Sequence, residues 1–227
     1  SSIRLSLKSP QGDVTLNYPK QFLTYPNPLE ERTQMAGKLV FVGYGIIAPE
    51  LQHDDYQDVD VEGKVVVTLS GKPKSFPSEE GAHFGSSREK FRHASENGAV
   101  GFITISTPTA EKVRPCQKLL NFLHTPTVRW LDKDGSPSGV QPQIKGSAYF
   151  SKETAELVFE DAELNLEEIY AMLEKDESPK GFDLPLSIQL ASTSTHSSIS
   201  SPNVAAILEG SDPNLKNEYV VYSAHSD

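Results

Sequence analysis

Short apolar runs separated by turn-forming residues predict a domain with more strands than helices. Residues 3–7 and 14–16 alternate between apolar and polar positions around a Gln-Gly-Asp turn, as two paired strands do. Residues 39–45, 65–69 and 100–105 are apolar at nearly every position, which is typical of strands buried on both faces of a sheet. The pattern therefore predicts a sheet with a buried centre and a half-exposed hairpin.

Three helices are predicted from N-capping residues followed by apolar residues at helical spacing. Ser86, with Glu89 three residues later, is expected to cap a helix that stops at Gly98, just before the strand at 100–105. Ser151 and Asn165 are expected to cap two further helices, each with an apolar face. A helix, a glycine stop and an apolar strand in that order form a unit of an α/β layer.

The composition changes near the end of the chain and suggests a domain boundary. We expect residues 1–190 to form one domain, and the Ser/Thr-rich residues 191–202 to form a linker or a solvated edge strand. Two further strands are predicted at 203–208 and 218–223, joined by a Gly-Ser-Asp-Pro-Asn turn, so residues 203–227 would begin a second domain. Before the boundary, the proline-rich residues 107–143 read as irregular, with a short strand at 127–131.

Charge and composition exclude several classes of function. The chain carries 31 acidic against 21 basic residues, a formal net charge of -10, and its Lys and Arg residues are scattered. This distribution argues against binding to nucleic acid or to an anionic membrane surface. No run of eighteen apolar residues exists, so no membrane span is predicted. Cys116 is the only cysteine, which rules out an internal disulfide, and we interpret it as an inert small side chain.

His225 and Asp227 are the strongest candidates for chemistry. They follow an apolar run and stand two residues apart, so on a strand both side chains would face the same side. A carboxylate in this position suits a metal-bound imidazole, because it fixes the tautomer and raises the basicity of the ligand. Catalytic zinc needs at least three protein ligands. We therefore expect the chain to be the front part of a zinc hydrolase; the alternative is an exposed histidine in a chance His-x-Asp.

Other polar groups are interpreted as structural. The acids of the segment His53, Asp54, Asp55, Asp58 and Asp60 lack the alternating ligand pattern and central glycine of a calcium loop, and are expected to serve as turn and cap residues. No glycine segment matches a phosphate-binding loop, and no serine lies in a nucleophile elbow. Four histidines without partners at metal spacing are expected to be solvated: His83, His93, His124 and His196.

Taken in order, several segments resemble a known family. Residues 41–50 (FVGYGIIAPE), 54–56 (DDY), 60–67 (DVEGKVVV), 90–94 and 98–101 resemble the protease-associated (PA) domain found within zinc aminopeptidases of clan MH, a family of secreted bacterial leucine aminopeptidases and glutamate carboxypeptidase relatives. Residues 203–210 and 219–227 are similar to the opening strands of the catalytic domain in that family.

The resemblance implies a fold, an activity and site residues. The fold would be α/β: a β-rich PA sandwich or open barrel with flanking helices, plus the first strands of an aminopeptidase domain. His225 would be a zinc ligand in the full-length enzyme, and Asp227 would support it from the second shell. The family has two zinc ions, and its bridging aspartate, glutamate pair and remaining ligands follow this point. Ser226 departs mildly from the pattern, which often has a bulky residue there.

The resemblance also implies a role for this chain. We expect residues 1–227 to be inactive alone and to hold no zinc, and whether the chain counts as an enzyme is left open. The parent would be a zinc metallo-aminopeptidase acting on peptide or protein substrates in an extracytoplasmic location. The PA domain would cover the active site or bind a substrate or partner. The alternative is a receptor or sorting module with the same fold and no catalytic function.

Overall fold

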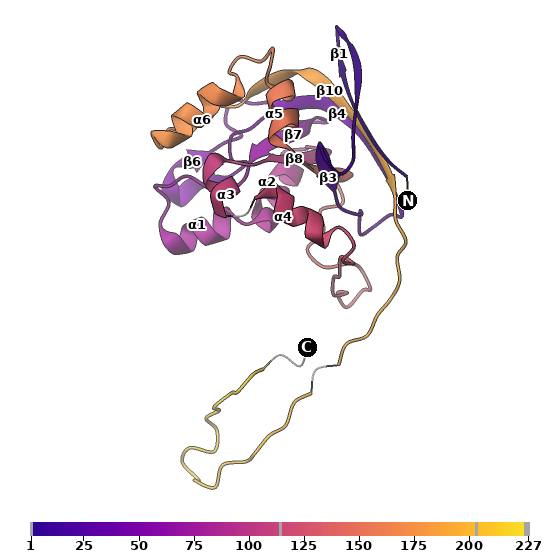
Figure 1. Cartoon of the computed structure of the whole chain (residues 1–227). Coiled ribbons are helices and arrows are strands. Elements are labelled where there is room, and N and C mark those ends of the chain that lie inside the picture. The colour runs from indigo at the N-terminus through magenta and orange to yellow at the C-terminus, as the bar shows by residue number, and fades with distance from the viewer. Residues whose placement is uncertain (1, 114, 203, 225–227) are drawn as a thin grey trace. The chain divides into compact units, whose positions relative to one another are not determined.

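The chain forms one folded unit followed by a separate extended segment (Figure 1). The computed structural model describes residues 2–113, 115–202 and 204–224, without the side chains of residues 116 and 117. The first unit is Ser1–His196 and the second is Ser197–Asp227. The predicted site residues His225 and Asp227 lie outside the described residues, as does the side chain of Cys116.

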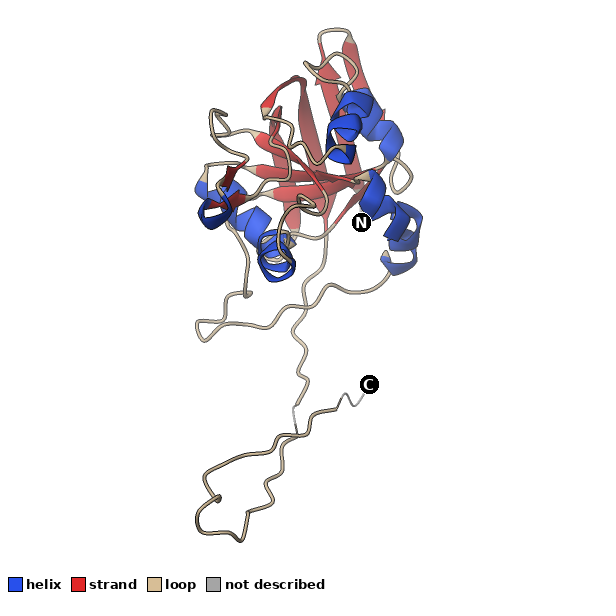
Figure 2. Ribbon diagram, turned by 90° about the vertical axis from the view of Figure 1, so that its left-hand side faces the viewer, coloured by secondary structure: helices blue, strands red, loops and turns tan. Residues whose placement is uncertain are grey.

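A single curled sheet of eight strands organises the first unit (Figure 2). Its strands, in spatial order, are β2 (Gly12–Leu16), β1 (Ile3–Ser9), β10 (Phe182–Thr193), β4 (Arg32–Phe41), β7 (Val65–Leu69), β8 (Gly101–Ile105), β9 (Gly146–Phe150) and β3 (Phe22–Thr24). The four strands from β4 to β9 are parallel, and the flanking strands pair antiparallel. A two-stranded ribbon of β5 (Ile47–Ala48) and β6 (His53–Asp54) lies apart from this sheet.

Helices connect and cover the parallel strands, as crossover connections require. They are α1 (Ser78–Phe84), α2 (Ser87–Glu96), α3 (Pro108–Val113), α4 (Cys116–Leu119), α5 (Lys152–Val158) and α6 (Leu166–Glu174), with short 3-10 turns η1 (Pro49–Leu51) and η2 (Leu120–Phe122). The predicted caps are confirmed: Ser86, Ser151 and Asn165 accept hydrogen bonds from backbone N–H groups of α2, α5 and α6. Asn165 and Glu168 form a complete capping box.

The two faces of the sheet bury different sets of side chains, because successive residues of a strand point to opposite faces. On one face, Val65 and Val67 join the larger core, in which Phe41 packs edge-on against Phe159 with ring centroids 5.2 Å apart. On the other face, Val66 joins a smaller core. That core contains Phe102 stacked on Phe91 of α2, with centroids 4.2 Å apart. The predicted β-rich α/β fold is thus confirmed as a curled mixed sheet with flanking helices.

Three strands of the sheet were not predicted, one predicted strand is absent, and β4 (Arg32–Phe41) begins and ends earlier than the strand predicted at 39–45. The strands β3 and β9 were not predicted, nor was β10, in which Pro185 interrupts the apolar pattern at a register shift against β4. The short strand predicted at 127–131 is wrong: Val128 and Trp130 are exposed, and the segment makes only an isolated bridge between Leu131 and Pro137. Without a neighbouring strand, its backbone has no ladder to join.

The sheet continues into the segment that composition predicted as a linker. β10 ends at Thr193, so residues 191–193 pair with β1 and β4. Two further hydrogen bonds follow: Ser194 N donates to the carbonyl oxygen of Glu31, and His196 N donates to the side-chain oxygen Glu31 Oε1. The Ser/Thr side chains of residues 191–193 are compatible with this inner strand because only alternate residues need to be buried.

The second unit has no regular secondary structure among its described residues. The strands predicted at 203–208 and 218–223 are therefore wrong for the residues of these segments that the structure describes. Their apolar side chains are almost fully exposed, for example Leu208 at 99% and Tyr222 at 94%, and an isolated two-stranded hairpin is marginal in water. The predicted turn is present: Asp212 Oδ1 accepts hydrogen bonds from the backbone N–H groups of Asn214 and Leu215.

Candidate functional site

The zinc site implied by the resemblance is not formed by the described residues. Among residues 2–113, 115–202 and 204–224, no three His, Cys, Asp or Glu side chains come together in a group able to hold a metal ion. His225 and Asp227 fall outside these ranges. The donor set in the described part thus does not fit a catalytic zinc ion, which needs three protein ligands.

In the acidic segment after β5, Asp54 and Asp60 serve turns as the sequence predicts, whereas the prediction is wrong for Asp55. Asp54 Oδ1 accepts a hydrogen bond from Tyr56 N at 2.9 Å, and Asp60 Oδ1 accepts one from Glu62 N at 3.1 Å. Asp55 is buried, and its Oδ2 accepts a hydrogen bond from Ile46 N at 2.9 Å. Its Oδ1 lies 3.0 Å from His53 Nε2, close enough for an ion pair but without hydrogen-bond geometry.

A buried lysine joins α2 to the end of β7. Lys90 of α2 is only 4% exposed, and its Nζ donates hydrogen bonds to the carbonyl oxygens of Leu69, at 2.9 Å, and Gly71, at 2.6 Å. These carbonyls lie where β7 ends and turns away from the sheet. The ring of Tyr44 lies 5.6 Å from the same ammonium group, a cation–π contact. Lys90 therefore fixes the carboxyl end of β7 to the first turns of α2.

Two glycines allow the loop after β4 to lie against the acidic segment. Gly43 and Gly45 have φ values of +52° and +70°, a conformation that other residues adopt at a cost. A Cβ on Gly43 would lie 2.7 Å from Asp55 Oδ1, and a Cβ on Gly45 would lie 2.8 Å from Thr68 Cγ2. The Gly-Tyr-Gly sequence is thus explained by close packing and backbone geometry.

Burial shifts the pKa of the groups in this cluster. Burial lowers the pKa of Lys90 to about 7, and the negative charge of Asp55 opposes that shift. Burial, with smaller contributions from Asp176 and Asp55, raises the pKa of Tyr44 to about 12. Burial also raises the pKa of Tyr56, whose hydroxyl is buried without a hydrogen-bond partner in the described part of the chain. The cluster therefore consists of ionisable groups kept from water, which indicates a structural network.

The prediction that four histidines are solvated holds for three of them. His83, His124 and His196 are exposed. His93 is 2% exposed, and its Nδ1 accepts a hydrogen bond from Ile47 N at 3.1 Å. Burial, followed by the charge of Arg92, lowers the pKa of His93. The prediction was wrong for His93 because its partner is a backbone N–H group 46 positions away, which no local spacing reveals.

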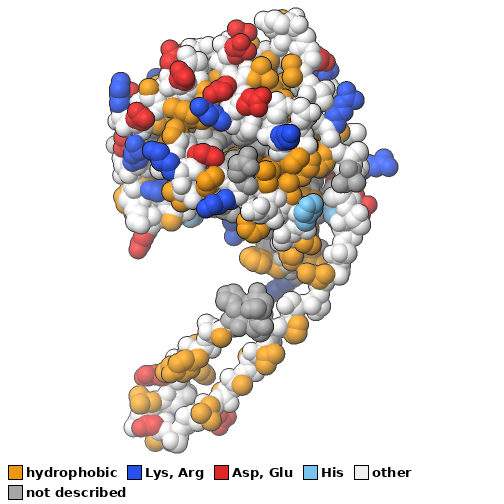
Figure 3. Space-filling view, viewed as in Figure 1, with side chains coloured by type: hydrophobic (Ala, Val, Ile, Leu, Met, Phe, Trp, Pro, Cys, Tyr) orange, Lys and Arg blue, Asp and Glu red, His pale blue; other side chains and the backbone are white. Residues whose placement is uncertain are grey.

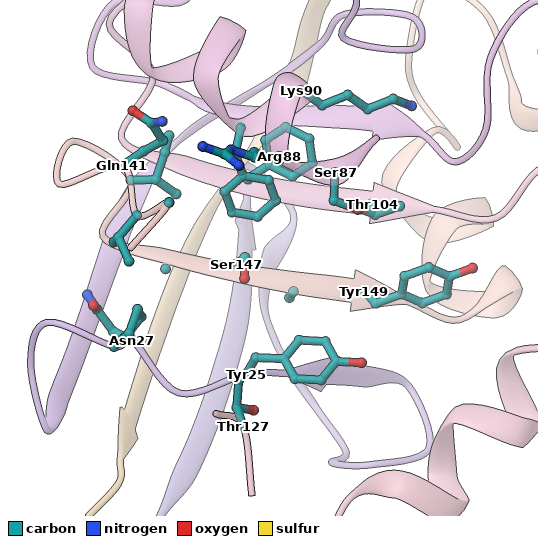
Figure 4. Close-up of a pocket in the computed structure, with 18 of the residues that line it drawn as sticks. Tyr25, Asn27, Ser87, Arg88, Lys90, Thr104, Thr127, Gln141, Ser147 and Tyr149 are labelled. Atoms are coloured by element: carbon teal, nitrogen blue, oxygen red, sulfur yellow. The ribbon is translucent and has the colours of Figure 1, made fainter. Parts of the chain in front are cut away.

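A cavity of about 750 Å³ opens into the folded unit. It lies between α2, the strands β8 and β9, and the irregular segments at 25–28 and 127–141 (Figure 4). Residues at its wall include Tyr25, Arg88, Trp130, Ser147 and Tyr149. Its size is within the range of small-molecule sites in proteins. Sequence reasoning missed it because its walls come from segments more than a hundred residues apart.

On the face shown in Figure 3, acidic and basic side chains are interspersed and no patch of one sign dominates. Among the described helices, none combines the length and the apolar character needed to cross a bilayer.

No protein-family model and no curated protein sequence matches this chain significantly. The buried cluster and the cavity are therefore the two features from which function can be argued.

Proposed function

We propose that residues 1–196 form a non-catalytic PA-like accessory domain of a zinc-dependent aminopeptidase. In the full-length enzyme, His225 would be a zinc ligand and Asp227 would orient it. The accessory domain would cover the active-site entrance or bind the peptide substrate or a protein partner. The enzyme would act outside the cytoplasm.

One observation carries the proposal: segments that resemble the PA domain contact one another in the folded unit. Gly43 of the first segment lies against Asp55 of the second, and Lys90 of a later segment holds the end of β7. Gly98 is the first residue of the segment 98–101. It follows the C-terminal end of α2 and has a φ of +85°. If this chain shares the PA fold, the residues that resemble the PA domain should contact one another through packing and hydrogen bonds. Catalysis would instead require them to face an open site.

The segment that follows the folded unit also supports the proposal. Its apolar residues, among them Val204, Leu208 and Tyr222, are exposed, although such residues normally form a core. An apolar segment that forms no strand among the described residues would gain hydrogen bonds by pairing with a sheet of another domain. The proposal assigns that sheet to a zinc peptidase domain.

The proposal is tested by comparing two proteins. Residues 1–227 should show negligible hydrolysis of a leucyl anilide, whereas the longest natural gene product that contains this chain should hydrolyse it and lose that activity with a chelator. Chelator-sensitive hydrolysis by residues 1–227 would contradict the accessory role. A full-length product without zinc-dependent aminopeptidase activity would contradict the assignment to an enzyme and favour a receptor or sorting module.

A further inference from the structure

The cavity beside α2 has an unusual charge for this chain. Acidic residues outnumber basic ones by 31 to 21 overall, yet none of the described residues that line the cavity is Asp or Glu. Arg88, Arg129 and Lys145 all line it, together with the buried Lys90. The lining of this cavity is therefore basic, although the chain as a whole has an excess of negative charge.

These cations are not neutralised by the protein. Within the described part of the chain, Arg88 makes no ion pair, Arg129 contacts only the carbonyl of Ser138 at 3.4 Å, and Lys145 donates only to the carbonyl of Pro142 at 3.0 Å. Arg92, by contrast, which also lies on α2, forms ion pairs with Glu89 and Glu96. The unpaired cations at the cavity therefore leave positive charge available to a ligand.

Two guanidinium groups converge on one point of the wall. Arg88 Nε and Arg129 Nη1 each lie 3.9 Å from the position that a Cβ on Gly139 would occupy. Gly139 has a φ of +68°, and it leaves space between the two side chains. Arg88 comes from α2 and Arg129 from the irregular segment, so separate parts of the chain bring like charges together. Like charges repel, and an anion between them would relieve that repulsion.

Aromatic and apolar side chains provide the rest of the cavity. Phe91 and Phe102 stack beside it, and Tyr25 and Trp130 line it while remaining 51% and 73% exposed. Figure 4 shows Arg88 and Tyr25 on opposite sides of Ser147 on β9. A flat ligand would thus meet aromatic surface at one part and positive charge at another.

We propose that this cavity binds a small organic anion, with its charged group between Arg88 and Arg129 and its apolar or aromatic body against Tyr25 and Trp130. The volume of about 750 Å³ favours a small molecule. The inference is independent of the aminopeptidase proposal, because it concerns a recess within residues 1–196 and needs no zinc.

The sole tryptophan of the chain provides a direct test. Anilinonaphthalene sulfonate is an aromatic anion that accepts excitation energy from tryptophan, and phenylnaphthylamine is a neutral dye of the same shape. In residues 1–227, the sulfonate should bind to one site with energy transfer from Trp130. It should bind about tenfold or more tightly than the neutral dye, because bonds to charged groups are the stronger ones.

Variants test whether the two arginines cause the preference for the sulfonate. Both arginines are exposed, so the double variant Arg88→Gln/Arg129→Gln should fold normally and bind the two dyes equally weakly. Arg32→Gln, which removes an exposed arginine outside the cavity, should leave the preference for the sulfonate intact. Trp130→Phe should abolish the energy transfer. Equal affinities for the two dyes in the unaltered protein, an undiminished preference in the double variant, or absence of sulfonate binding would each overturn the proposal.

Discussion

Lys90 Nζ donates a hydrogen bond to the carbonyl oxygen of Gly71 over 2.6 Å, which links the first turns of α2 to the turn after β7. The ammonium group makes a second bond to the carbonyl oxygen of Leu69 and is shielded from water. This arrangement places a titratable group inside the domain, and its protonation should therefore affect stability.

Lys90 should make the free energy of unfolding depend on pH. Its pKa is about 7 in the folded state against an ordinary value of 10.5, so between these values the unfolded chain binds a proton that the folded chain lacks. Stability should thus rise with pH from about 7 to about 10, with a limiting slope of about 1.4 kcal/mol per pH unit. Urea unfolding across this range measures the slope.

The matched variants for this prediction are Lys90→Met and Lys20→Met. The first replaces the buried amine by an apolar side chain of similar length and should remove the rise with pH. The second alters an exposed lysine and should preserve it. If Lys90→Met retained the full slope, the assignment of the titration to Lys90 would be wrong.

Gly43→Ala should destabilise the domain more than Gly63→Ala. Both glycines have positive φ, which costs an alanine about 1–2 kcal/mol. Only at position 43 would the new Cβ also collide with Asp55 Oδ1, whereas Gly63 has open space around it. Thermal unfolding of the two variants measures the difference, and equal losses would show that the contact with Asp55 is unimportant.

Asn165→Ala should cost about 1 kcal/mol of stability, because it removes the oxygen that accepts a hydrogen bond from Glu168 N at the start of α6. Asn165→Asp retains an acceptor and should cost little. Denaturant unfolding of the three proteins tests this prediction. A stable Ala variant would mean that packing of α6 alone determines the stability of its first turn.

The domain boundary can be tested by truncation. Residues 1–196 should unfold at the same temperature as residues 1–227, because the segment after His196 has exposed side chains and no core of its own. Residues 1–190 should unfold at a lower temperature, because they lack the end of β10 that pairs with β1 and β4. Equal melting of the two shorter chains would place the boundary at residue 190.

Elements with strong local signals were predictable from the sequence. β7 and β8 are continuous apolar runs, and α2 begins after a serine cap and ends at Gly98, whose φ is positive. These features depend on a few neighbouring residues, and tertiary contacts then agree with the local preference. β10 was missed because Pro185 and its polar residues look like a loop, and only pairing with β1 and β4 makes it a strand.

The candidate sites were harder to predict because they are made by distant segments. The need for glycine in the Gly-Tyr-Gly loop follows from the contact between Gly43 and Asp55, which the sequence does not show. The burial of His93 likewise depends on a hydrogen bond from the distant Ile47 N. The cavity joins Tyr25, Arg88 and Trp130 from three parts of the chain. Local spacing carries information about faces of single elements, and it carries none about which elements meet.

The zinc content and aminopeptidase activity of the longest natural gene product, with and without His225→Ala, test the central claim most directly. The account predicts that His225→Ala loses zinc and leucyl-anilide hydrolysis together, whereas His196→Ala, which alters an exposed histidine of the accessory domain, retains both. Full zinc content and full activity in the His225→Ala protein would contradict the account.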